Sequence, residues 1–272
     1  MTETFPEHVQ AAFHADRGPI ERLDAAWGYG WRVGPVCVMR AMASDSAGWS
    51  ARVREKLSVE GLRIARPLRS TDGRYVVSGW RASSWIEGTC ARRVDETVGA
   101  ALRLDDALST LNVPLPDQPH GGSVFDQADQ AAAAGEDHGS ALAARLIRNT
   151  PSCEAPLQVC HADMLGTTIF HGSNKPALTD IVGTRRPHGY SAALCIIDGL
   201  MMGAVDARII HRWRHIPHLE SLLFQALTYR VLVEVLDDSR DQSLDADAER
   251  VSRLLFDAFE HSSDSCPGDM PH

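Results

Sequence analysis

The chain has 272 residues, of which 44% are hydrophobic and 23% are charged, which is typical of a globular protein with a substantial buried core. Its formal net charge of −9 argues against a nucleic-acid-binding protein. No apolar stretch approaches the ~18 residues that a membrane-spanning helix needs, so no membrane partner is expected.

The cysteines and the N-terminus indicate a cytoplasmic protein. Six cysteines are scattered without a CxxC pair, and Cys37 and Cys195 lie inside apolar runs, which is typical of reduced, buried thiols. The polar N-terminus lacks the basic region of a signal peptide. The histidines at 211, 215 and 218 suggest zinc, but Pro217 interrupts their helix and no carboxylate completes a zinc motif, so we expect no zinc there.

Residues 1–88 predict a small sheet with one helix packed against it. A polar helix is expected over residues 1–22, and a hairpin with a glycine-bearing turn should follow, with residues 36–39 as a β-branched strand. Ser44–Ser46 fits the N-cap of a helix that runs to Leu57.

The next segments predict more strands. Residues 64–68 and 75–77 flank the strong hairpin turn signal of residues 70–74. Residues 80–86 then predict one further strand.

Helical periodicity dominates the rest of the chain. Helices are expected over residues 94–111, 128–147, 191–204, 219–236 and 245–259, with short strands between 157 and 181. The expected class is therefore α+β. Its parts are a small N-terminal antiparallel sheet lobe (1–88), a larger helical C-terminal lobe (89–261) and a disordered tail (262–272).

Two aspartates carry the chemical signal. Asp163 lies in the sequence His161–Asp163, and Asp180 follows after two strand-like segments. In phosphoryl transfer one carboxylate can accept the proton of a hydroxyl acceptor, while another ligates Mg²⁺ that bridges the phosphates of a nucleotide. A single His-x-Asp arises often by chance, and the paired arrangement is more specific.

On these residues the chain resembles the aminoglycoside phosphotransferase and choline kinase-like superfamily, and more narrowly an uncharacterised actinobacterial branch of it. The segment His161–Phe170 is similar to the branch's His-Gly-Asp-Leu-x-Gly-Asn-Val-Leu-Phe, and Pro176–Ile181 stands where the family has its metal-binding aspartate. Shorter matching motifs are Trp31–Gly34, Ala65–Pro67, Asp72–Arg74, Gly79–Trp80, Arg186–Pro187 and His218–Leu219. The resemblance implies the bilobal protein-kinase-like fold.

The resemblance also implies roles for individual residues. Asp163 would be the catalytic base or the carboxylate that orients the acceptor, and His161 would be a buttress of the catalytic loop. Asp180 would be the Mg²⁺ ligand. ATP or GTP would be the phosphoryl donor, with Gly28 and Gly30 in the loop that contacts it.

Two positions depart from the family pattern. Thr167 stands in place of the metal-binding asparagine, and its hydroxyl could still ligate Mg²⁺. Met39 stands where the phosphate-binding lysine is expected, and a thioether cannot neutralise a phosphate.

The substitute for that lysine stays open. Arg40 could bind the phosphates only if the strand shifts by one residue, which would turn its side chain to the opposite face. Arg32 and Arg185 are the other candidates. The acidic partner of the lysine is also unclear, since Ser46 falls near its place and Glu55 comes later in the helix.

Two functions follow from these observations. The aspartate pair favours a phosphotransferase that transfers the terminal phosphoryl group of a nucleotide to a hydroxyl of a small molecule or peptide, weakened by the loss of the lysine and the asparagine. The two departures from the family pattern, Met39 and Thr167, favour a catalytically silent kinase-fold module that binds a nucleotide, metabolite, peptide or partner protein in a biosynthetic complex. Asp198 is expected to be a paired core carboxylate instead of a substrate contact.

Overall fold

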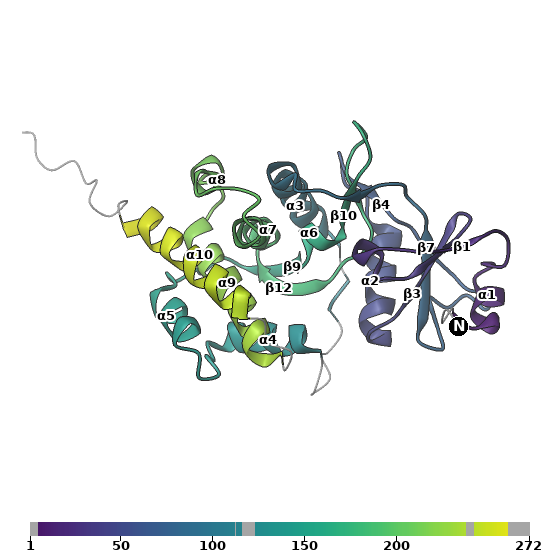
Figure 1. Ribbon diagram of the computed structural model, residues 1–272, viewed down its shortest axis with the longest axis horizontal. Helices are drawn as coiled ribbons and strands as arrows, with labels where there is room; N and C mark the ends of the chain where they lie inside the picture. The colour runs from purple at the N-terminus through teal and green to yellow at the C-terminus, as the bar shows by residue number, and fades with distance from the viewer. Residues whose placement is uncertain (1–4, 112, 116–122, 238–241, 261–272) are drawn as a thin grey trace, which may run out of the picture. The chain divides into compact units, whose positions relative to one another are not determined.

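The computed structural model describes residues 5–111, 113–115, 123–237 and 242–260, so the predicted tail of residues 262–272 lies outside the described residues (Figure 1). The chain forms two compact units. The first comprises residues 1–117 and 156–192, and the second comprises residues 118–155 and 193–272.

An antiparallel sheet lies at the N-terminal end of the first unit, with the described strands in the order β1-β2-β3-β7-β5 and with β6 also paired to β7. Its strands are β1 (Ile20–Arg22), β2 (Trp31–Val33), β3 (Val36–Arg40), β5 (Pro67–Leu68), β6 (Val76–Val77) and β7 (Trp80–Ser84). The predicted hairpin is confirmed as β2 and β3, which join through Gly34 at a φ of 58°. β3 and β7 pair along their whole length and set Met39 opposite Arg81.

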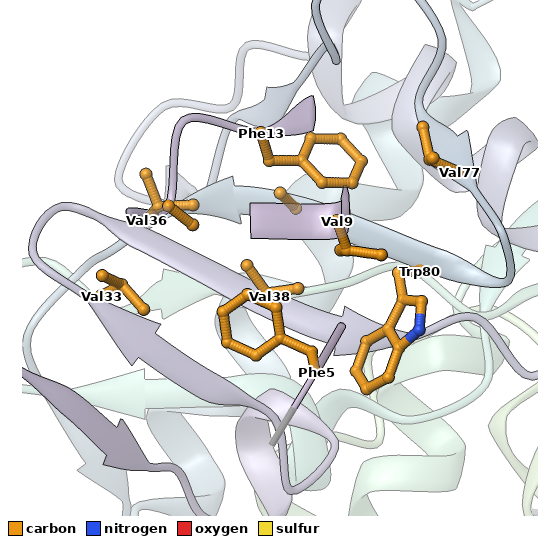
Figure 2. Close-up of a cluster of buried hydrophobic side chains, with 10 residues drawn as sticks. Phe5, Val9, Phe13, Val33, Val36, Val38, Val77 and Trp80 are labelled. Atoms are coloured by element: carbon orange, nitrogen blue, oxygen red, sulfur yellow. The ribbon is translucent and has the colours of Figure 1, made fainter. Parts of the chain in front are cut away.

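The two faces of this sheet carry different side chains because residues alternate along each strand. On one face Val36, Val38 and Trp80 form a hydrophobic core with the segment that contains α1 (Glu7–Ala12), as Figure 2 shows. Cys37 and Met39 point to the other face and belong to a second buried cluster with Ile169 and Ala177. The helix α2 (Ser44–Lys56) bonds to this second face through Arg54 and Ser83.

Three expectations for this region need correction. The helix predicted over residues 1–22 is wrong in length, because the chain leaves α1 through His14 and Gly18, both at positive φ, and enters β1. The helix predicted to end at Leu57 is confirmed, but its N-cap is Ala43, which makes no side-chain cap. The turn at residues 70–74 forms, yet its flanking strands pair with β7 and not with each other.

The rest of the first unit holds the loops of Asp163 and Asp180 between short strands. These elements are β4 (Arg63–Ile64), β8 (Thr89–Cys90), α3 (Val94–Ser109), β9 (Leu157–His161), α6 (Met164–Thr167), β10 (Thr168–Phe170), β11 (Ala177–Leu178) and β12 (Gly183–Pro187). β4, β11, β10 and β8 form one sheet in that order, and β12 pairs with β9. Asp163 therefore lies between β9 and α6, and Asp180 lies between β11 and β12.

The second unit is helical. It contains α4 (Val124–Ala134), α5 (Ala141–Asn149), α8 (Arg208–Arg212), α9 (Leu219–Leu236) and α10 (Gln242–Glu260), and α7 (Tyr190–Met201) leads into it. α9 contacts α4, α5 and α10. The single helix predicted over residues 128–147 is wrong, because Gly135 and Gly139, at φ values of 72° and 78°, separate α4 from α5.

Asp198 is paired within the second unit, as expected. Its two carboxylate oxygens accept hydrogen bonds from Arg230 at 2.6 and 2.7 Å. The cysteines among the described residues are free thiols, and no described helix has the length and apolar character that a bilayer crossing requires.

The core of Figure 2 gives a stability prediction. Phe13 is 2% exposed there, so we expect Phe13→Ala to lower the free energy of unfolding by about 3–5 kcal/mol through lost burial and a residual cavity. Met42 is 94% exposed in the same unit, and Met42→Ala should change it by less than about 0.5 kcal/mol. Denaturation followed by tryptophan fluorescence checks both, and equal losses would contradict the assigned core.

Candidate functional site

Asp163 is fixed at the end of a strand and the start of a short helix. It is the N-cap of α6, and its carboxylate accepts a hydrogen bond from the Gly166 backbone N–H at 3.1 Å. A Cβ on Gly166 would lie 2.5 Å from an Asp163 carboxylate oxygen, so only glycine permits this approach. Asp163 as a residue is half-buried, so part of it reaches solvent.

His161 supports the loop that carries Asp163. Its ring is fully buried, and the Val182 N–H donates to Nδ1 at 2.9 Å, which leaves the proton on Nε2. Nε2 then donates to the Thr167 hydroxyl at 2.7 Å, and that hydroxyl donates to the Asp163 carbonyl. Burial lowers the pKa of His161, which keeps the ring neutral. These contacts hold the backbone of the Asp163 loop in place.

A buried carboxylate on α3 completes the support. Asp105 accepts hydrogen bonds from the Gly189 N–H at 3.0 Å and from the Ser191 hydroxyl, while Ser191 Oγ accepts from the His161 backbone N–H at 2.7 Å. Burial raises the pKa of Asp105 to about 7. Asp105 was not predicted from the sequence, and its position on the buried face of α3 beside Leu104 and Leu108 was the available signal.

Asp180 is held by two arginines and a serine. Arg81 Nη2 lies 2.6 Å from one carboxylate oxygen, and Arg54 Nε lies 3.5 Å from the other. The Ser50 hydroxyl donates to that second oxygen at 2.6 Å. Burial acts to raise the pKa of Asp180, but the Arg81 and Arg54 charges and these hydrogen bonds outweigh it and hold the pKa well below its usual range.

Arg54 lies at the centre of this group. It is 1% exposed, and its Nη1 donates to the carbonyls of Ala65 and Thr179 and to the Ser83 hydroxyl at 2.9 to 3.0 Å. Burial lowers the pKa of Arg54 to about 10, which leaves it charged at neutral pH. The acidic residue considered for this helix, Glu55, instead pairs with Arg69 at the surface.

The structure brings Arg81 to Asp180, and the contacts of Arg40 and Arg32 lie elsewhere. Arg81 lies opposite Met39, so it comes from the strand next to the expected lysine position. Arg40 is exposed, and its guanidinium stacks 4.2 Å above the Trp80 ring, on the face away from Asp180. Arg32 is directed toward Glu21 and the Trp85 ring.

The two glycines of the predicted nucleotide loop have different environments. Gly28, at a φ of 56°, ends the 3₁₀ helix η1 (Ala25–Trp27) at an exposed position with space around it. Gly30 is buried, and a Cβ there would lie 2.4 Å from the Val38 carbonyl. Gly30 therefore allows the loop to pack tightly on β3, while Gly28 permits the turn.

The side chain of Trp27, in the same loop, packs in the core of the first unit. Its side chain is 1% exposed, belongs to the cluster with Met39 and Ile169, and lies 5.2 Å from the Trp85 ring between centroids. The Thr179 hydroxyl donates to the Ala26 carbonyl at 2.6 Å and anchors the loop.

A pocket of about 580 Å³ opens beside Trp27. The loop after β1, the segment after β7 and the turn after β10 supply its walls: Arg22, Leu23, Asp24, Trp27, Trp85, Glu87, Gly88, Thr89, Phe170, His171 and Gly172. Aromatic side chains (Trp27, Trp85 and Phe170) and charged side chains (Arg22, Asp24 and Glu87) line it together.

The contacts of Asp180 and Thr167 do not fit Mg²⁺. Ser50, Arg54 and Arg81 already bond the Asp180 carboxylate, and the Thr167 hydroxyl is engaged by its neighbours on both sides. In the part of the chain that the structure describes, no group of three His, Cys, Asp or Glu side chains could hold a metal ion. A cation here would also repel the guanidiniums, by about 4 kcal/mol per unit-charge pair at ~4 Å and an effective dielectric of ~20.

Comparison with known proteins gives structural matches only. No family model and no curated protein sequence matches this chain. A choline/ethanolamine kinase family protein from Mesorhizobium loti matches with a TM-score of 0.57 and 15% identity, over 90% of both chains. The spectinomycin phosphotransferase APH(9)-Ia, solved with ADP and spectinomycin, matches with a TM-score of 0.54 and 12% identity, over 92% of this chain and 96% of that one.

A further match confirms the same fold. A thermostable mutant of the aminoglycoside phosphotransferase APH(4)-Ia, in a ternary complex with AMP-PNP and hygromycin B, has a TM-score of 0.52 and 13% identity, over 91% of this chain and 94% of that one. The α+β kinase-like fold predicted from the sequence is confirmed.

The raised pKa of Asp105 predicts a pH dependence of stability. The unfolded chain releases this proton near the ordinary value of 3.8, whereas the folded protein holds it to about 7. The Asp105 contribution to the free energy of unfolding should therefore fall as the pH rises from about 4 to about 7. Asp105→Asn has no carboxyl that titrates at this position, so its free energy of unfolding should lack this pH dependence. Denaturation of both proteins at several pH values between about 4 and about 7 checks this prediction. Parallel profiles for the two proteins would contradict the assignment.

Proposed function

We propose that this chain, whose fold is that of the aminoglycoside phosphotransferase and choline kinase-like superfamily, transfers the terminal phosphoryl group of a nucleotide to a hydroxyl of a small molecule or peptide. The observation that carries the proposal is the geometry of Asp163. A buried scaffold holds this carboxylate at a helix N-terminus while the residue remains half-buried.

Asp163 would act on the acceptor side of the reaction. An ionised carboxylate only accepts hydrogen bonds, so it can orient a hydroxyl and take its proton during transfer. The Gly166 N–H fixes its orientation, and the bond from Thr167 to the Asp163 carbonyl fixes the backbone beneath it. His161, neutral and buried, would keep this geometry without exchanging a proton itself.

We infer the classes of donor and acceptor from the ligands of two structural neighbours. The neighbours contain ADP with spectinomycin, and AMP-PNP with hygromycin B. For this chain they support ATP or GTP as the donor and a hydroxylated small molecule as the acceptor. A peptide serine or threonine presents the same hydroxyl chemistry, so a peptide acceptor remains within the proposal, in a cytoplasmic setting.

Replacement of Asp163 tests this function. Asp163→Asn keeps a side-chain oxygen for the helix N-cap but cannot accept a proton, so turnover should fall about 10²- to 10⁴-fold without loss of thermal stability. The measurement is transfer of labelled γ-phosphate from ATP to a panel of aminoglycosides, choline and serine-containing peptides. Equal turnover in both proteins, or no turnover of wild type across the panel, would contradict the proposal.

A second candidate function has its own supporting observation. Both Asp180 oxygens are bonded by protein donors, and Trp27 is buried between β3 and β10 in the cluster with Met39 and Ile169. These contacts favour a catalytically silent module that binds a nucleotide, a metabolite, a peptide or a partner protein in a biosynthetic complex. It predicts a stable complex in a native extract, and a protein that elutes alone there, or that turns over ATP, would contradict it.

A further inference from the structure

We propose that Arg54, Asp180 and Arg81 form a metal-independent site for a polyphosphate group, with Arg81 as the residue that contacts the phosphate. The identity of the polyphosphate as part of a nucleotide rests on the proposed function. The site itself rests on charge, burial and an unused hydrogen-bond donor.

The charges of the cluster do not cancel. Arg54 and Arg81 face one carboxylate, so two positive charges meet one negative charge within 3.5 Å. Buried charges are stable when they are paired and hydrogen-bonded. The remaining positive charge favours an anion, whereas a divalent cation would add to it.

The two arginines have different contacts. Arg54 is enclosed, and its bonds to Ser50, Ala65, Ser83 and Thr179 commit it to the fold. Arg81 retains 15% of its side-chain exposure, and its Nε is buried without a hydrogen-bond partner. A buried donor without an acceptor costs about 1–3 kcal/mol, and an arriving oxyanion would supply that acceptor.

The position of Arg81 suits a phosphate. It projects from β7 on the same face as Met39 of the neighbouring strand, beside Asp180. A guanidinium offers several donors in a planar fork that matches phosphate oxygens, and it carries its charge at every physiological pH. Arg81 thus provides the positive charge that neither Met39 nor a metal ion provides.

The proposal and a metal site predict opposite effects of the same substitution. In the proposed site Asp180 competes with the phosphate for Arg81, so Asp180→Asn should tighten polyphosphate binding in the absence of metal. If Asp180 were a metal ligand, Asp180→Asn would weaken binding in Mg²⁺ and change nothing in EDTA.

Calorimetric titration with inorganic tripolyphosphate and with ADP, in EDTA and in MgCl₂, tests the site. Wild type should bind in EDTA, and Arg81→Met should weaken that binding about tenfold or more through loss of a charged hydrogen bond. Arg40→Met is the matched control, because it removes an exposed cation from the opposite face of the same sheet, and it should bind like wild type.

Binding that requires Mg²⁺, no binding in EDTA, or equal effects of Arg81→Met and Arg40→Met would overturn the site. Tighter binding of ADP than of tripolyphosphate would identify a nucleotide as the source of the phosphates, and equal binding would identify the polyphosphate group alone; both support the site. Arg81-dependent binding without phosphoryl transfer would overturn the proposed function but leave the site standing. Phosphoryl transfer together with polyphosphate binding that strictly requires Mg²⁺ would support the proposed function and overturn the site.

Discussion

The buried guanidinium of Arg54 is the interaction on which the first unit depends. A charge removed from water is tolerated only when acceptors surround it, and the acceptors of Arg54 come from separate parts of the chain. Ser50 lies on the same helix, Ala65 follows β4, Ser83 lies on β7, and Thr179 and Asp180 follow β11. Satisfying one side chain therefore fixes α2, the N-terminal sheet and the segment that carries Asp180 against one another.

This arrangement changes the chemistry available at Asp180. In the pattern that the sequence suggests, a lysine would contact phosphates and Asp180 would bind Mg²⁺. Here Met39 is neutral, Arg81 reaches Asp180 from the adjacent strand, and Arg54 adds a second positive charge. The carboxylate is bonded to protein donors, and in the site that we propose it would position the two guanidiniums. The loop of Asp163 is supported by His161 and Asp105, and Thr179 bonds it to the segment that carries Asp180.

The sequence was most informative where the signal is local. Hydrophobic periodicity located α3 and α9, and the glycine-bearing turn located the β2–β3 hairpin. The helix expected at residues 128–147 failed because two glycines in left-handed conformations weigh more than the periodicity around them. Arg54, Arg81 and Asp105 were missed for a different reason. Most of their partners lie more than ten residues away along the chain, so no local pattern shows which buried charged side chains meet, although Asp105 stands beside the buried Leu104 and Leu108.

In the site that we propose, arginine and not a metal ion neutralises the anion. A crystal grown with ADP and MnCl₂, analysed by anomalous scattering from manganese, tests it most directly. We expect the Arg81–Asp180 ion pair to persist, a phosphate oxygen to accept a hydrogen bond from Arg81, and no manganese peak to lie at the Asp180 carboxylate. A manganese ion coordinated by Asp180, with Arg81 displaced from it, would rule out the proposed site.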